Sequence, residues 1–330
     1  MHHAGRPVPQ PRGVRVAGAL ERRQVPLYVG AIVAGVVLGL CVPGAGPGLS
    51  TAVDPVLGAL LFVTFLQVPA RELAGAWRAG RFLGAVLLVN FVVVPAVVAV
   101  LAAFLPTDDA LRAGVLLVLL APCVDYVVVF SRLAGAAADR LLAATPLLLV
   151  AQMALLPVYL RMLGGPGVGG DLGPFVEAFL VLIVVPLASA WAVQAWAARH
   201  RAGAVFAAGA GTLMVPLMVA TLLLVVASQV PALGGDPAVL VVVPVYVVFL
   251  LIMPFLGLGV ARLLRLGPGE ARAVVFSGAT RNSLVVLPLA LALPAGAGVA
   301  AAAVVTQTLV EVLAMVGYVR LVPRLVPARA

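Results

Sequence analysis

The chain contains no lysine, only two cysteines (Cys41 and Cys123) and three histidines. Charged residues make up 10% of it, whereas globular domains carry about 25%. So little charge excludes a large water-soluble domain, and two cysteines at different expected depths exclude a disulfide framework. The histidines fall at the N-terminus and at an expected helix end, so we expect no metal ligand among them. No Walker motif or other catalytic motif is present, and we predict neither an enzyme nor a bound cofactor.

Most residues of the chain are apolar. They make up 64% of it, and the mean hydropathy is +1.20. The net charge of +9 comes entirely from arginine, and the arginines lie in short connectors between apolar runs. That placement is typical of membrane topology rather than of nucleic-acid binding, so the expected partner is the lipid bilayer and no nucleic acid.

The apolar runs predict an all-α integral membrane protein with ten transmembrane helices. The predicted spans are 25–42, 53–68, 82–105, 110–134, 141–163, 174–197, 202–230, 237–261, 271–293 and 299–322. They divide into two five-helix repeats, 25–163 and 174–322. The polar tail 1–24 is expected to be disordered on the cytoplasmic surface, and 323–330 forms a second cytoplasmic tail.

The arginines also predict the orientation. With the N-terminus in the cytoplasm, all of them fall on the cytoplasmic side except Arg112, Arg161 and Arg281. Because cytoplasmic loops of membrane proteins are enriched in basic residues, both termini should be cytoplasmic and the protein should lie in the plasma membrane. Each repeat has an odd number of spans, so the second repeat starts on the opposite side of the membrane from the first. It must therefore be inverted relative to the first, as in many secondary transporters.

Two of the predicted spans are interrupted at polar residues. In the fourth, Pro122 breaks the helix next to Cys123 and Asp125, and an unpaired Asp at mid-membrane costs roughly 2.5–3.5 kcal/mol. In the ninth, Arg281 lies in the polar stretch 277–283. We therefore predict that the fourth and ninth helices are broken and cross, with half-helix ends and unwound backbone forming an ion or substrate site.

Asp125 and Arg281 are the main candidates for chemistry at that crossing. One interpretation is that they only pair to offset each other's burial. The functional one is a carboxylate that alternately holds a proton and pairs with Arg281, which stays charged. Arg281 itself could bind an anionic substrate or occupy the place of a coupling cation.

Other side chains could complete the site. Cys123 is either a small buried hydrophobe or a soft ligand for a thiophilic solute such as trivalent arsenic. Glu311 could relay a proton or simply bond to a neighbouring polar group. Four oxygen-bearing side chains are candidates for the site lining: Thr280, Asn282, Ser283 and Gln307.

These motifs resemble the bile acid:sodium symporter superfamily, most closely its arsenite-efflux branch. In that branch the fourth-span break carries a functional cysteine, and Cys123 matches its position. The sequence Thr-Leu-Val-Glu-Val at 308–312 is similar to the tenth-span motif of the branch, and Ala-Thr-Arg-Asn-Ser at 279–283 is similar to the ninth-span break of the symporters. The resemblance implies a core domain with the crossed helices and a panel domain made of the first, second, sixth and seventh spans.

Two positions depart from the family pattern. Leu284 stands where the arsenite exporters carry a functional Glu, and Arg281 stands where the symporters have a sodium-site Gln. A fixed guanidinium there should repel sodium. We therefore predict a secondary transporter that exports arsenite or a related small oxyanion in exchange for protons. The alternatives are a carrier of an organic anion, with Arg281 binding its carboxylate, and a membrane sensor that transports nothing.

Overall fold

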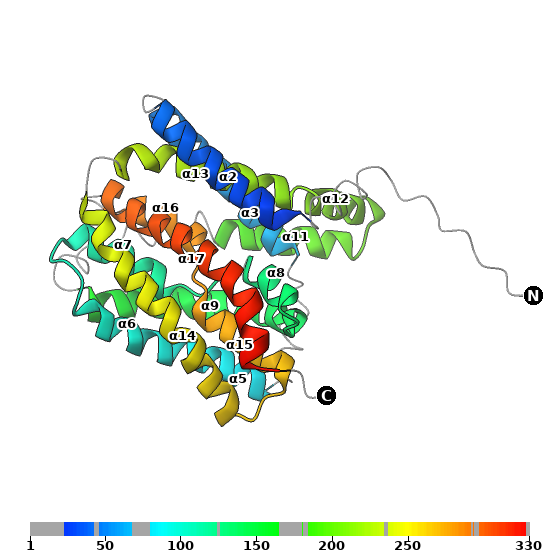
Figure 1. Cartoon of the computed structure of the whole chain (residues 1–330). Helices are drawn as coiled ribbons and strands as arrows, with labels where there is room; N and C mark the ends of the chain where they lie inside the picture. Colours follow the sequence, from blue (N-terminus) through cyan, green and yellow to red (C-terminus); the bar gives the residue numbers. More distant parts are fainter. Residues whose placement is uncertain are drawn as a thin grey trace, which may run out of the picture.

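The computed structural model describes residues 23–42, 46–67, 80–123, 126–164, 184–233, 237–291 and 297–327, together with residues 180 and 293. Throughout these ranges the regular elements are helices (Figure 1). Asp125, most of the predicted tail 1–24 and the first part of the predicted span 174–197 lie outside the described residues.

Three described helices are long and apolar enough to cross a membrane: Gly80–Ala102, Leu240–Leu263 and Gly298–Leu325. Two bent pairs raise this number to as many as five, Ala138–Thr145 with Leu147–Leu163 at 46° and Arg201–Gly211 with Met214–Ser228 at 42°. The chain therefore has the helices of a membrane protein, and the total of ten spans stays a prediction.

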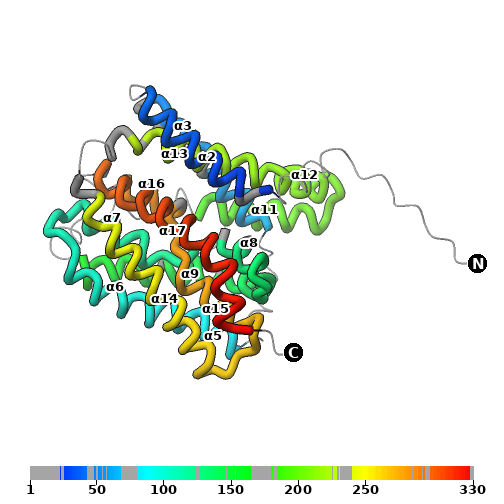
Figure 2. Tube along the Cα trace, in the orientation of Figure 1, coloured from blue at the N-terminus to red at the C-terminus, as the bar shows by residue number. Residues whose placement is uncertain are grey.

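The helices form two groups, which Figures 1 and 2 show one above the other. The first group, which we call the panel, consists of α2 (Gln24–Cys41), α3 (Gly46–Leu66), α11 (Val185–Ala197), α12 (Arg201–Gly211) and α13 (Met214–Leu233). Its members correspond to the first, second, sixth and seventh predicted spans, as the resemblance implies. Small residues let these helices approach closely: a Cβ added at Gly35 of α2 would lie 2.9 Å from Val226 Cβ of α13.

The second group, the core, holds the two interrupted helices. The first is α7 (Asp109–Leu120) followed by α8 (Tyr126–Leu133), and the second is α15 (Pro268–Ala279) followed by α16 (Ser283–Leu291). Around them pack α5 (Gly80–Leu88), the π-helical turn η3 (Val89–Val93), α6 (Val94–Ala102), α9 (Ala138–Leu163), η5 (Pro237–Val242), α14 (Val243–Leu263) and α17 (Ala297–Leu325). Each half-helix is at most 12 residues long, about 18 Å, and is too short to span a bilayer by itself.

Two arginines tie the N-terminal halves of the interrupted helices to the ends of neighbouring helices. Arg112 of α7 donates to Leu163 O at the end of α9, at 3.0 Å, and to Ala102 O at the end of α6, at 3.1 Å. Arg272 of α15 donates to Val326 O, just beyond α17, at 2.9 Å. The last carbonyls of a helix have no partner within it and carry partial negative charge, so each arginine satisfies groups that would otherwise need water.

The contact between α7 and α17 allows no side chain at Gly114. A Cβ built there would lie 2.4 Å from Ala300 O and 2.8 Å from Ala300 Cα. Because those atoms belong to backbone, they cannot move aside as a flexible side chain would. The first half of the interrupted helix is thus held against α17, the helix that carries Glu311.

We predict that Gly114→Ala destabilises the protein by about 1–3 kcal/mol, the usual cost of overpacking a close contact. The matched control is Gly317→Ala in α17, where an added Cβ meets nothing within 4 Å. Alanine favours helix over glycine by about 1 kcal/mol, so the control should be neutral or stabilising. Thermal unfolding of the purified protein in detergent measures both, and equal midpoints for the two variants would contradict the packing described.

Candidate functional site

The two interruptions meet and complete each other's backbone hydrogen bonds. Cys123 N donates to Thr280 O at 3.3 Å, and Asn282 N donates to Ala121 O at 2.9 Å. Pro122 and Arg281 form an isolated antiparallel bridge between these bonds. Unwound backbone is tolerated inside a membrane protein only where its polar groups find partners, and here each break supplies them for the other.

The breaks coincide with the positions predicted from sequence, but for different local reasons. Ahead of Pro122, Ala121 is extended, with φ −96° and ψ 113°, a conformation that the proline ring favours in the residue before it. The second break contains no proline. There Thr280 is extended, with φ −101° and ψ 141°, and Asn282 Oδ1 accepts from Val285 N at 3.1 Å, which caps the start of α16.

The guanidinium of Arg281 is buried at this crossing, with 0% of the residue exposed. Its Nη2 donates to Ser277 O at 2.7 Å and to Gly278 O at 2.8 Å, both in the last turn of α15. Its Nη1 donates to Leu119 O at 3.4 Å, in the last turn of α7. One cation therefore sits against the C-terminal ends of both half-helices, where the helix dipoles favour positive charge.

Two side chains from other helices also contact the guanidinium. Arg281 Nη2 donates to Asn90 Oδ1 at 2.9 Å, and Arg281 Cζ lies 5.5 Å from the centre of the Phe249 ring, within cation–π range. Asn90 is itself fully buried and donates to Ser277 Oγ at 2.8 Å. It lies in the π-helical turn η3, and such turns frequently mark functional sites.

Glu311 of α17 contacts the second break. It is 0% exposed, and its Oε2 accepts from the backbone N–H of Arg281 at 2.9 Å and from Gln307 Nε2. Its partners thus include the neighbouring polar group that the sequence analysis considered. They also include the unwound backbone itself, so a change in the charge of Glu311 would act directly on the crossing.

The remaining predicted lining residues are buried and divide into two kinds. Thr280 is satisfied within its own helix, since its hydroxyl donates to Phe276 O at 2.7 Å. By contrast, each of the other three lining residues has a buried polar atom without a hydrogen-bond partner among the described residues: Asn282 Nδ2, Ser283 Oγ and Gln307 Oε1. A buried polar atom without a partner costs free energy, so such atoms indicate where a polar solute or water would be bound.

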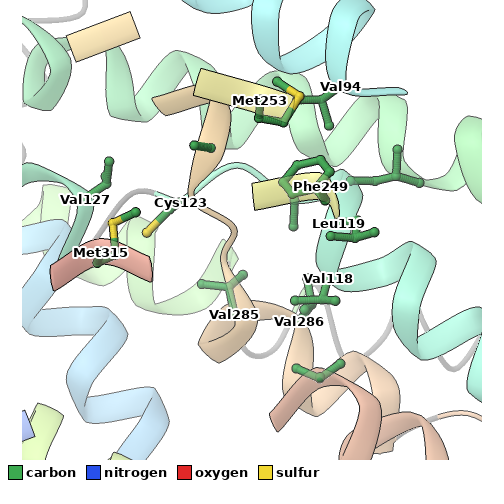
Figure 3. Close-up of a cluster of buried hydrophobic side chains, with 14 of the residues drawn as sticks. Val94, Val118, Leu119, Cys123, Val127, Phe249, Met253, Val285, Val286 and Met315 are labelled. Carbon is green, nitrogen blue, oxygen red and sulfur yellow. The ribbon is translucent and has the colours of Figure 1, made fainter. Parts of the chain in front are cut away.

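Cys123 is 1% exposed and lies in the hydrophobic core. Figure 3 shows it within a cluster of buried hydrophobic side chains that includes Val285 and Met315. Cys41, by contrast, is exposed, and neither cysteine forms a disulfide. Among the described residues no group of three or more His, Cys, Asp and Glu side chains is placed to hold a metal ion.

The predicted pair of Asp125 and Arg281 stays a prediction, because Asp125 lies outside the described residues. What the sequence reasoning missed is the role of Asn90 and Phe249 as neighbours of the guanidinium. An isolated amide in the apolar run 82–105 was the available signal for Asn90. Nothing in the sequence distinguishes Phe249 from the other apolar residues of α14 as a neighbour of the guanidinium.

A model of the SBF-like CPA transporter family matches residues 27–319, most of the chain. The chain belongs to this family. The match confirms the bile acid:sodium symporter superfamily that the motifs predicted, and it makes the protein a membrane transporter with a small solute as substrate. The arsenite-efflux branch stays a prediction. A comparison with curated proteins finds none that matches.

We predict that Asn90→Ala destabilises the protein by about 1–3 kcal/mol, because it removes a buried acceptor from a charged donor and a donor from Ser277. Asn90→Asp keeps an oxygen for Arg281 and should retain more stability. Gln67→Ala, at an exposed amide, is the control and should change little. Thermal unfolding in detergent measures all three. If Asn90→Ala unfolds at the wild-type temperature, Asn90 does not position the guanidinium.

Proposed function

We propose that this transporter is a secondary active carrier of the plasma membrane that moves a small oxyanion in exchange for protons and needs no sodium. The observation that carries the proposal is the position of the Arg281 guanidinium. In secondary transporters with broken helices, unwound carbonyls and half-helix C-terminal ends coordinate the coupling cation. Here carbonyls of the last turns of α7 and α15 accept from a cation that is covalently part of the chain.

The contacts of Arg281 agree better with a role in place of the coupling cation than with a role in binding the substrate. The guanidinium donates to three backbone carbonyls and to Asn90 Oδ1, it stacks near Phe249, and no part of it is exposed. A carboxylate ligand would have to displace several of those bonds. The organic-anion carrier with Arg281 as the anion site is therefore the second candidate, and it requires a conformation in which the guanidinium turns out of the crossing.

Ten spans in two inverted repeats, with both termini cytoplasmic, remain the architecture that we propose. Corresponding contacts in the two halves support it. Arg112 of α7 binds the end of α9, and Arg272 of α15 binds the carbonyl just beyond α17. Gln152 of α9 and Gln307 of α17 each leave a buried Oε1 without a partner among the described residues. The two backbone hydrogen bonds at the crossing also correspond, because each break donates one of them and accepts the other.

The coupling proton would be carried by a carboxyl group, since Arg281 keeps its charge at physiological pH. Glu311 and Asp125 are the two candidates. Glu311 is supported by its contacts: it accepts from the backbone N–H of Arg281 and from Gln307, and protonation would weaken both bonds. Loading and release of a proton there would bias the arrangement of the second break, which is how a proton gradient could drive exchange.

Trivalent arsenic, as arsenite, is the substrate that we propose first. A thiolate is the softest ligand that a protein offers, and Cys123 is directly bonded through its backbone to the second break. The unpartnered polar atoms of Asn282, Ser283 and Gln307 are available for the oxygens of such a solute. A membrane sensor that transports nothing would use the same fold, and only a flux measurement separates it from the two carriers.

We predict that Cys123→Ser abolishes arsenite accumulation by everted membrane vesicles under a pH gradient and abolishes arsenite resistance in a sensitive host. Cys41→Ser is the control: it removes the exposed cysteine and should transport like the wild type. Immunoblots establish equal amounts of each variant in the membrane.

Full transport and protection by Cys123→Ser would contradict the arsenic assignment but leave a carrier of another anion. If the wild type moves no member of a panel of arsenite, other oxyanions and small carboxylates, the sensor interpretation replaces both carriers.

A further inference from the structure

A second polar region lies far from the crossing. Ends of three membrane-length helices meet in this region. The helices Leu240–Leu263 and Gly298–Leu325 finish there, and Gly80–Ala102 begins there. Figure 1 shows the start of α5, the turn between α14 and α15 and the C-terminal end of α17 at one end of the molecule. Because the ends of spanning helices lie at the level of the lipid headgroups, this region should face the membrane–water boundary.

Two adjoining cavities open at this place, on either side of the turn between α14 and α15. The larger, about 630 Å³, is lined by a mainly apolar set with two arginines: Leu258, Ala261, Arg262, Arg265, Leu325 and Val326. The smaller, about 380 Å³, is lined by Arg81, Phe82, Arg140, Arg265, Leu266 and Glu270. Arg265 and Leu266 line both cavities, so an apolar hollow and a basic one share a wall.

The charge around these cavities is unbalanced. Four arginines face one acid, Glu270, which forms an ion pair with Arg140. Arg81 donates to the backbone oxygens of Leu264 and Arg265, and these do not neutralise it. Arg262 and Arg265 are exposed, and in the part of the chain that the structure describes neither side chain has an ion-pair partner. The region therefore presents positive charge that an external anion could balance.

Arg265 is also held in an unusual conformation. Its φ is +52°, and it is the one non-glycine residue with positive φ in the described ranges. Leu266 N donates to Ala261 O at 2.9 Å, so α14 ends in a left-handed cap of the kind that glycine usually makes. After α8, Gly135 occupies the left-handed position of such a cap, with φ +66°. At the end of α14 an arginine takes this place, and its side chain lies at the wall between the two cavities.

We propose that these cavities bind one anionic phospholipid. Its phosphate diester is recognised by Arg262 and Arg265, because guanidinium groups match phosphate oxygens in charge and geometry. The apolar walls at Leu258 and Leu325 receive the adjoining part of an acyl chain. A lipid fits better than a free phosphate because the larger cavity is mainly apolar and lies where helices leave the membrane.

Native mass spectrometry of the full chain in detergent tests the proposal. The probes are phosphatidylglycerol and phosphatidylcholine with the same acyl chains, and inorganic phosphate at millimolar concentration. The wild type should retain phosphatidylglycerol at least about fivefold more than phosphatidylcholine, because the quaternary ammonium group of phosphatidylcholine neutralises its phosphate, whereas phosphatidylglycerol keeps a net negative charge for the arginines. Inorganic phosphate should not displace the lipid.

The variant Arg262→Gln/Arg265→Gln should lose at least about four-fifths of this retention. Its matched control is Arg199→Gln/Arg201→Gln, which removes one arginine from the turn after α11 and one from the first position of α12; neither residue lines these cavities. A third variant, Arg265→Gly, separates binding from folding. Glycine adopts the left-handed conformation without strain, so the thermal midpoint should hold or rise while lipid retention falls.

Three results would overturn the proposal. The first is equal retention of the two lipids by the wild type. The second is an equal loss of retention in both double variants, which would mean that only total charge matters. The third is displacement of the lipid by inorganic phosphate, which would make the region a site for a free anion.

Discussion

The burial of a permanent positive charge at the crossing is the constraint on which this structure depends. An isolated ion moved into a medium of low dielectric constant loses many kilocalories per mole of hydration, and arginine cannot escape by releasing its proton. Arg281 is matched instead by the carbonyls of two half-helix ends, by Asn90 and by the face of Phe249. Two helix C-termini that point at one spot would otherwise repel each other, so the crossing and the cation stabilise one another.

This mutual dependence bears on how such a transporter can work. A cation that enters and leaves the crossing couples its own gradient to the movement of the solute, whereas a tethered one is present in every state. In the exchange that we propose, the energy comes from a group that changes its charge. Glu311 accepts a hydrogen bond from the backbone N–H of Arg281, so a titratable carboxyl group contacts the unwound backbone of the residue that carries the fixed charge.

The sequence predicted the parts of the site that arise from local chemistry. Pro122 disfavours a helical conformation of the residue before it and stands next to Cys123 and Asp125, and the polar stretch 277–283 interrupts an apolar run, so both breaks were predictable. The fully helical fold and the superfamily also followed from the apolar runs and the motifs. Which helices form the panel came from the resemblance, because apolar periodicity alone does not say which span packs on which.

What the sequence could not provide is contact between distant residues. Asn90 lies 191 residues from Arg281, and the π-helical turn that presents it has no signature in the apolar run around it. Asp125, the predicted partner of Arg281, lies outside the described residues. The contacts described for the guanidinium include carbonyls and an amide, which carry no formal charge and cannot be found by counting charges. The same holds for the cavities beside Arg265, which depend on how three helix ends meet.

Flux through the purified wild type in liposomes, with sodium as the only variable, tests the central claim most directly. Arsenite uptake is followed under an imposed pH gradient, once with sodium on both sides and once with sodium replaced throughout by a large organic cation. If the guanidinium occupies the place of the coupling cation, the pH gradient drives uptake at the same initial rate in both media. Uptake that disappears without sodium and persists without the pH gradient would contradict the account.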